Sequence, residues 1–452
     1  MRAVEAAGRG PAADGAPDPY LPDTGDRGFR VARYELDLDY RVASNRLTGH
    51  ARVIAVAARD LPQFTLDLCG LRVVRVKVDG HRPLRYRQGP RKLAVQLHRA
   101  IPDGRPFEIE VQYQGSPRPI RGRWGEVGWE ELSDGVIVAG QPEGAPTWFP
   151  CNDRPDDKAS YRVSVTAESP YTVLANGTLV EQRVRSSRTT WVYEQPQPMA
   201  SYLATVQIGR YTFSETDTRS VRQVLATTPS LRRAAQHDFA RQPKMITAFQ
   251  DMFGQYPFDS YTVVITDDEL EIPLEAQSLS IFGSNHVDGQ RGSERLIAHE
   301  LAHQWFGNSL TLGRWCDVWL HEGFACYAEW LWSERSGGLA AGTLARREWQ
   351  RLKHLPQDLV LADPGPDRMF DDRVYKRGAL TLHALRQILG DRAFFSMLTA
   401  WTSTHRHSTV TTGAFVQHAT AALSGSDGQR VATLLSSWLR QPELPDLPVR
   451  AD

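Results

Sequence analysis

The sequence lacks an excess of charge of either sign. Its 452 residues include 53 basic and 53 acidic side chains, so the formal net charge is zero, and neither sign is concentrated in a long block. Proteins that bind nucleic acids or anionic membranes normally carry a basic patch. We therefore expect no nucleic-acid partner and no membrane partner, and instead a soluble protein that binds a small molecule or a peptide.

Cysteine is scarce, and the four that occur form no C-x-x-C pair: Cys69, Cys151, Cys316 and Cys326. Disulfide frameworks are typical of small secreted domains, whereas scattered cysteines are typical of proteins in a reducing compartment. We expect free thiols and a cytoplasmic location.

Long apolar segments are also absent. No run of about 20 apolar residues is available to span a bilayer, and the first residues lack the apolar core of a secretion signal. Residues 1–26 are rich in Ala, Gly, Pro and Asp instead. Because such a composition cannot bury much apolar surface, we expect a disordered tail over 1–26.

The first half of the chain has the pattern of strands. A chain of this length is expected to form two or three domains. The segment RYELDLDYRV alternates Tyr34, Leu36 and Leu38 with polar residues, which is the period of a half-buried strand. Similar short segments follow, and Gly, Pro, Asn or Asp separates most of them. We expect an N-terminal antiparallel β-sheet or β-sandwich domain over residues 27–211.

The second half has a different pattern. A helical segment that ends at Gly254 is followed by two strand-like segments, YTVVITDDEL and SLSIFG. From Ser293 onward the helical period predicts helices over Glu294–Phe306, Leu320–Arg335, Leu344–His354, Val374–Leu389, Ala393–Trp401, Thr412–Leu423 and Val431–Leu439. We therefore expect an α+β protein whose second domain, residues 212–452, is mixed at first and then all-helical.

Two histidines four residues apart, His299 and His303, lie in the segment RLIAHELAHQWFGN. Residues at this spacing share one face of a helix, so both imidazoles can be directed at one point, with Glu300 beside them. A catalytic zinc needs a third protein ligand and an open position for water. Glu322, separated from His303 by 18 residues, lies in a second helical segment and can supply that ligand.

A packed helix with two polar core histidines is the alternative, because H-E-x-x-H also occurs by chance. The suitably spaced Glu322 favours a zinc site. Glu329 lies seven residues later, on nearly the same helix face, and is either an acceptor for a ligand histidine N–H or a surface glutamate. Cys326 lies one turn from Glu322, and we interpret it as a small core residue.

Further motifs accompany this pattern. HELAHQWFGNSLT followed by DVWLHEGFACYAEWL resembles the zinc aminopeptidase family that includes aminopeptidase N and the leukotriene-forming epoxide hydrolase. QPEGAPTWFPCNDRPDDKASY, MASYLATVQIGRY and VYKRGALTLHALR resemble other landmarks of that family, in the same order. The resemblance extends from about Arg30 to Pro445, and it implies a thermolysin-like catalytic domain in the second half of the chain.

The resemblance also implies roles for individual residues. His299, His303 and Glu322 would bind one Zn²⁺ per chain, and Glu300 would be the general base that takes a proton from a zinc-bound water. Tyr375 would donate a hydrogen bond to the oxyanion. Judged from the sequence pattern alone, Tyr375 is equally compatible with a packing role in the first turn of a helix.

An aminopeptidase must also hold the free α-ammonium group of its substrate. In the family, a Gly-Ala-Met-Glu-Asn strand and a Gln or Glu of the sheet domain do this. The segment EIPLEAQSLS places Glu275 at the glutamate position. Gln141, ten residues before Cys151, matches the second position, and Glu143 is the alternative for it.

The sequence departs from the family pattern at Ile272 and Pro273, which replace Gly-Ala, at Ala276, which replaces Asn, and at His321, where Asn is usual. We expect the bulk of Ile272 to narrow the primary pocket or to shift the strand. The chain also resembles a short form of the family without the C-terminal helical domain, so we expect a more open cleft.

The function that the sequence favours is a zinc-dependent aminopeptidase acting on peptides with a free N-terminus. An epoxide hydrolase on the same zinc site, a non-catalytic scaffold and an endopeptidase are the alternatives. Loss of Glu300 or of a ligand would favour the scaffold, and none is lost. The sequence has no feature that indicates the oligomeric state.

Overall fold

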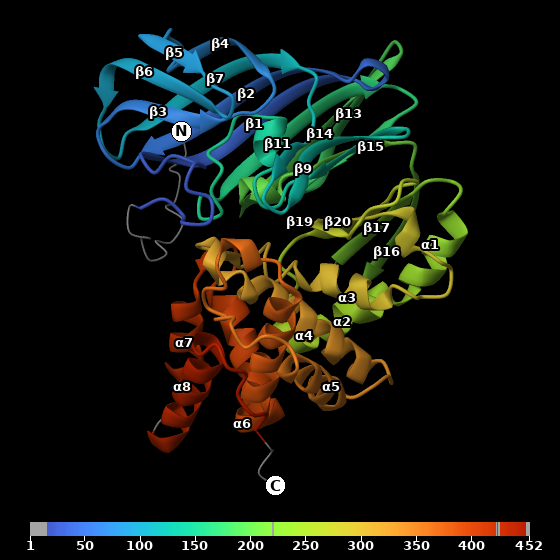
Figure 1. The fold of residues 1–452 in the computed structure, drawn as a ribbon. Coiled ribbons are helices and arrows are strands. Elements are labelled where there is room, and N and C mark those ends of the chain that lie inside the picture. The colour runs from blue at the N-terminus through green and yellow to red at the C-terminus, as the bar shows by residue number, and fades with distance from the viewer. Residues whose placement is uncertain (1–15, 219–220, 422, 424, 449–452) are drawn as a thin grey trace.

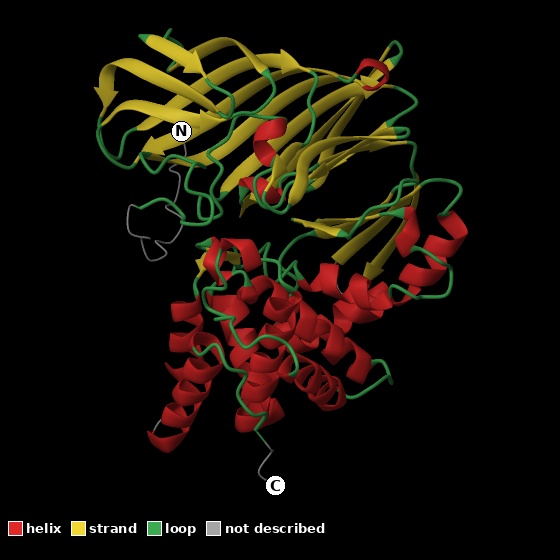
Figure 2. Cartoon of the chain, in the orientation of Figure 1, coloured by secondary structure: helices red, strands yellow, loops and turns green. Residues whose placement is uncertain are grey.

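The computed structural model describes residues 16–448 except 219–220, 422 and 424. Residues 1–15, which belong to the expected tail, lie outside this part. The described residues form a β region, with a smaller mixed sheet and a group of helices below it, as Figures 1 and 2 show. This order of sheets followed by helices confirms the α+β prediction.

The largest sheet of the described chain has seven strands. In spatial order they are β13 (Thr178–Arg185), β14 (Arg188–Met199), β11 (Ala159–Glu168), β1 (Phe29–Arg41), β2 (Arg46–Ala57), β7 (Pro106–Gly115) and β4 (Arg72–Val78). Tyr34, Leu36 and Leu38 of β1 are buried, as the period of two predicts. The pairs are antiparallel except β1 with β11, which run parallel in the centre of the sheet.

Two smaller sheets complete the β region. One contains β12 (Thr172–Ala175), β15 (Val206–Gly209), β10 (Gly135–Ala139), β9 (Gly125–Leu132) and β8 (Ile120–Gly122). The other contains β3 (Leu61–Asp67), β6 (Lys92–Ile101) and β5 (Arg85–Gln88). Large aromatic side chains fill the space between the sheets, and Trp129 and Trp148 are fully buried with ring centroids 6.3 Å apart.

The mixed sheet contains β16 (Thr212–Thr218), β17 (Val221–Thr227), β18 (Ser260–Ile265), β20 (Leu279–Phe282) and β19 (Leu274–Ala276). Strands β17, β18 and β20 are parallel, whereas β19 is an edge strand antiparallel to β20. Glu275 is the middle residue of β19, so the sheet edge presents it to the helices that follow.

The helices are α1 (Arg232–Asp238), α2 (Gln242–Phe253), α3 (Glu294–Ala302), α4 (Trp319–Arg335), α5 (Ala341–Lys353), α6 (Asp372–Thr404), α7 (Thr412–Ala421) and α8 (Gly425–Arg440). The short strands β21 (Thr311–Leu312) and β22 (Thr409–Val410) pair between them. Gly390 has a φ of 74° and breaks α6 into the two helical segments that the sequence predicts. None of the described helices combines the length and the apolarity needed to cross a bilayer.

Helix α3 ends four residues before the predicted Phe306. From Asn308 onward the backbone hydrogen bonds span five residues instead of four, with Asn308 N–H donating to the carbonyl of His303 at 3.0 Å. Gly307, with a φ of 131°, permits the turn. The turn brings the chain back toward β19 directly after the second histidine.

Residues 16–26 belong to the expected tail, yet they pack against the helical region. The Tyr20 hydroxyl donates to Asp363 Oδ1 at 2.6 Å, and the side chain is only 6% exposed. Asp18 Oδ2 accepts a hydrogen bond from the backbone N–H of Trp315 at 2.8 Å. The segment therefore joins the β region to the loops that precede α4 and α6, which corrects the expectation of disorder for these residues.

Candidate active site

Helix α3 presents His299 in its last turn and is followed directly by His303. The backbone N–H of His303 still donates to the carbonyl of His299, at 3.2 Å, so the helical spacing continues through both residues. The two rings are buried, and their centroids lie 4.8 Å apart. The i, i+4 spacing thus places both imidazoles on one face, as predicted.

Glu322 faces these histidines from the first turn of α4. Its Oε2 atom lies 3.3 Å from Nε2 of His299 and 3.5 Å from Nε2 of His303. The three ligand atoms lie within 4.8 Å of one another, and all three residues are buried. Donors about 2.0–2.1 Å from a tetrahedral zinc stand roughly 3.3 Å apart, so these spacings fit that ion.

The other ring nitrogens fix the orientation of both imidazoles. Nδ1 of His299 lies 2.7 Å from Oε1 of Glu329, and Nδ1 of His303 lies 3.0 Å from the carbonyl oxygen of Phe306. Both partners are acceptors, so each Nδ1 carries a proton and each Nε2 is the nitrogen directed at Glu322 and available to a metal ion. Glu329 is therefore placed as the acceptor, rather than as a surface glutamate.

The charges of this cluster also suit a cation. Burial disfavours the charged imidazole, but Glu322 and Glu329 outweigh it and raise the pKa of His299 to about 10. Burial opposes ionisation of Glu322 as well, yet His303 and His299 hold its pKa well below the usual range. The carboxylates therefore favour positive charge between them and the imidazoles, which is what a divalent ion provides.

Glu300 lies beside the candidate ligands and has a free acceptor. Its Oε2 atom is buried and has no hydrogen-bond partner among the described residues. Burial, together with the negative charge of Glu275, raises the pKa of Glu300 to about 7, although the two histidines oppose this shift. A carboxylate with such a pKa can both accept and release a proton near neutral pH.

Glu275 lies next to Glu300. Carboxylate oxygens of these two residues and a ring nitrogen of His303 lie within 4.8 Å of one another. They form a second group that could hold a metal, but it has only one imidazole. The His299, His303 and Glu322 set, with both Nδ1 atoms held, suits zinc better.

Two residues that the sequence analysis did not single out hold β19 against the end of α3. The side-chain amides of Gln304 and Asn308 both donate to the carbonyl oxygen of Ala276, at 3.1 and 2.9 Å. The Gln304 side-chain oxygen accepts from the backbone N–H of Ser278 at 2.7 Å. Both amide side chains are fully buried, and their positions one and five residues after His303 are the signal that could have identified them.

Tyr375 lies in the first turn of α6, and its ring is stacked on His299, with centroids 6.2 Å apart and an interplanar angle of 18°. Burial raises the pKa of its phenol well above the usual value, and the negative charges of Glu322 and Glu275 add to the shift. The hydroxyl is therefore a protonated donor close to the candidate metal ligands.

Gln141 and Glu143 differ in what they contact. Nε2 of Gln141 is buried and lacks a hydrogen-bond partner within the described part of the chain. Glu143 is buried in an ion pair with Arg91. Gly140, directly before Gln141, packs closely on the backbone of Tyr202. The Tyr202 hydroxyl donates to the carbonyl oxygen of Gly307 at 3.5 Å, so Tyr202 links the Gln141 segment to the turn that follows His303. Glu143 is committed to Arg91, which favours Gln141 as the second polar group.

The departures from the family pattern leave the ligand geometry intact. Ile272 is 63% exposed and precedes β19, so most of its side chain faces solvent. His321 is buried and accepts a hydrogen bond at Nε2 from the backbone N–H of Leu312, at 2.9 Å. Burial lowers the pKa of His321 to about 3, so this ring is a neutral structural acceptor.

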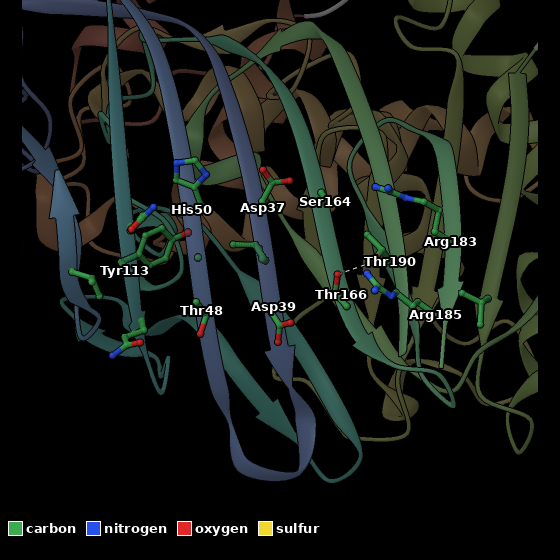
Figure 3. A pocket seen from close by; sticks show the side chains of 16 residues that line it. Asp37, Asp39, Thr48, His50, Tyr113, Ser164, Thr166, Arg183, Arg185 and Thr190 are labelled. Atoms are coloured by element: carbon green, nitrogen blue, oxygen red, sulfur yellow. Dashed lines mark hydrogen bonds between the residues drawn. The ribbon is translucent and has the colours of Figure 1, made fainter. Parts of the chain in front are cut away.

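A hollow of about 880 Å³ lies elsewhere, on the open face of the seven-stranded sheet. Figure 3 shows polar side chains from neighbouring strands lining it, including Asp37 and His50. Thr166 and Thr190 are hydrogen-bonded across two of these strands, at 2.7 Å. The lining residues include none of the candidate catalytic or ligand side chains.

Comparison with known proteins gives the family. The Peptidase M1 N-terminal domain matches residues 31–203, and the Peptidase family M1 domain matches residues 237–438. Probable aminopeptidase 2 of Sulfurisphaera tokodaii is 24% identical over 444 residues, which are 92% of this chain and 54% of that protein. Aminopeptidase M1 of Arabidopsis thaliana is 26% identical over 338 residues, which are 70% of this chain and 38% of that protein. The chain thus spans about half the length of such relatives, or less.

The fold is similar to that of an M1 zinc metallopeptidase from Deinococcus radiodurans. The TM-score is 0.88 at 30% identity, and the match covers 96% of this chain and 99% of that one. A mutant of that metallopeptidase, bound to a Tyr-Ser-Ala substrate, gives a TM-score of 0.87 at 29% identity, with the same coverage. On these matches, the chain belongs to peptidase family M1.

Proposed function

We propose that this chain is a zinc-dependent aminopeptidase that hydrolyses N-terminal residues from peptides. His299, His303 and Glu322 hold one Zn²⁺ per chain in this proposal, and their nitrogen and carboxylate donors suit that ion. When bound, zinc would act as a Lewis acid that lowers the pKa of a water molecule to near neutral pH.

The protein's own groups then move the proton and stabilise the developing charge. Glu300 accepts a proton from the attacking water through its unpartnered Oε2 atom and delivers that proton to the departing amine. Tyr375 stays protonated, because its pKa is raised, and donates a hydrogen bond to the oxyanion of the scissile carbonyl.

Glu275 is the residue that distinguishes an exopeptidase from a general zinc hydrolase. Its carboxylate lies beside Glu300, with ligand atoms of the Glu275, Glu300 and His303 group within 4.8 Å of one another. A substrate ammonium group bound to Glu275 therefore places the first peptide bond next to the base. Gln141 adds a second polar contact to the ammonium group through its side-chain oxygen.

Matched chromogenic amides test this function. We expect hydrolysis of aminoacyl amides with a free amine, little hydrolysis of their N-acetylated counterparts, and loss of activity with a chelator that added zinc restores. Equal cleavage of the acetylated amides would contradict the exopeptidase assignment. Full activity after removal of the metal would contradict the zinc mechanism.

A further inference from the structure

Glu329 of α4 contacts the candidate metal centre on one side and an arginine at the surface on the other. Its side chain is 2% exposed, whereas that of Arg295 is 59% exposed. Nη1 of Arg295 lies 3.0 Å from Oε1 and 2.9 Å from Oε2 of Glu329. The same Oε1 atom lies 2.7 Å from Nδ1 of His299. One carboxylate oxygen thus joins the guanidinium to a candidate zinc ligand.

Helical spacing produces this arrangement. Arg295 and His299 are four residues apart on α3, and Glu322 and Glu329 are seven apart on α4, so each pair shares a helix face. These two helix faces are in contact at both nitrogens of His299: Glu322 faces Nε2, and Glu329 faces Nδ1 of the same ring. The imidazole is therefore held at both nitrogens.

Arg295 donates a hydrogen bond to Oε2 of Glu329, the carboxylate oxygen that His299 does not contact. A buried carboxylate needs partners for both oxygens, and an unpaired buried charge is costly. His299 reaches Oε1 only, whereas the guanidinium contacts both oxygens and fixes the plane of the carboxylate. Without Arg295, Oε2 of Glu329 loses this donor, and the contact between Oε1 and His299 is left to orient the carboxylate.

We propose that Arg295 is a positioning residue of the metal centre: it fixes the Glu329 carboxylate, which holds His299 with its Nε2 atom directed at the zinc position. This inference rests on the zinc site of the proposed function. Groups that orient ligand histidines contribute about 10–100-fold to metal affinity, and Arg295 acts one contact further out.

The zinc affinity of the 452-residue chain tests this role, measured by competition with a chromophoric chelator. We expect Arg295→Met to raise the Kd for zinc by about 3–10-fold and Glu329→Gln to raise it by about 10–100-fold. Arg295→Lys keeps the charge and one donor, and it should recover part of the loss. In the Glu329→Gln background, Arg295→Met should add no further change, because the two residues act through one contact.

Trp332→Phe is the structural control. Nε1 of Trp332 donates to Oε1 of Glu294 at 2.7 Å, so this variant breaks another contact between α3 and α4 without touching Glu329. It should lower the Tm and leave the zinc Kd within about twofold of the wild type. A wild-type Kd in Arg295→Met, or additive effects with Glu329→Gln, would overturn the role of Arg295 and leave the proposed function standing. A wild-type chain that retains no zinc would overturn the proposed function as well.

Discussion

Gly323 of α4 and Gly378 of α6 meet where the two helices cross. A β-carbon on Gly323 would lie 2.7 Å from Cα of Gly378, and one on Gly378 would lie 2.6 Å from Cα of Gly323. Glu322 precedes the first glycine, and Tyr375 lies one turn before the second. The absence of two side chains therefore sets the separation between a candidate zinc ligand and the candidate oxyanion donor.

Gly378→Ala should force the helices apart, because the atoms in the way belong to the backbone and cannot rotate aside. We expect a loss of about 1–3 kcal/mol in the free energy of unfolding, measured in urea. We also expect kcat to fall by about 10–100-fold, because small displacements of catalytic groups are costly. Gly342→Ala in α5 is the control, since a β-carbon there meets nothing closer than 3.6 Å. Wild-type stability in Gly378→Ala would show that the crossing tolerates a methyl group.

Glu300→Gln should separate metal binding from catalysis. The amide cannot accept the proton of the attacking water, but it leaves His299, His303 and Glu322 in place. We expect about one zinc per chain by elemental analysis and a kcat lower by about 10²–10⁴-fold. Glu271→Gln changes an exposed acid in the loop before β19 and should leave both quantities unchanged. Turnover at the wild-type rate in Glu300→Gln would exclude this residue as the base.

Glu275→Gln should weaken recognition of the substrate amine. Loss of one partner of a buried charge pair costs about 2–5 kcal/mol, and we expect kcat/KM for aminoacyl amides to fall accordingly. Amides that lack the amine gain no binding from Glu275, so their slow hydrolysis should change only through the lower pKa of Glu300 that follows loss of the Glu275 charge, and by a much smaller factor. If kcat/KM of the variant falls by the same factor for both kinds of amide, Glu275 acts on the chemistry or the fold and not on recognition of the amine.

Local periodicity predicted much of this structure, because it reports contacts within one element. The alternation in β1 and the four-residue spacing of His299 and His303 are local patterns, and both occur as predicted. Gly390 separates two predicted helical segments because its positive φ interrupts the helix, so α6 consists of two helices joined at a kink. The segment around Glu322 begins a helix as predicted.

Contacts between distant segments could not be derived in the same way. The parallel pairing of β1 with β11 joins residues more than 100 positions apart, and no local pattern encodes it. Residues 16–26 have the composition of a flexible segment, yet Tyr20 finds its partner at Asp363. Gln304 was not singled out because its role depends on the carbonyl of Ala276, a contact that only the fold brings about.

Tyr375→Phe should lower kcat while leaving substrate and metal binding intact. The phenyl ring can keep its stacking on His299, and only the hydroxyl is lost. Removal of one oxyanion donor costs about 10²–10³-fold in kcat, and KM and zinc content should stay near the wild-type values. Tyr327→Phe is the matched control, because its hydroxyl contacts Nδ1 of His383 at 3.2 Å, away from the candidate ligands. A fall in zinc content together with kcat would instead assign Tyr375 a packing role against His299, the alternative that the sequence left open.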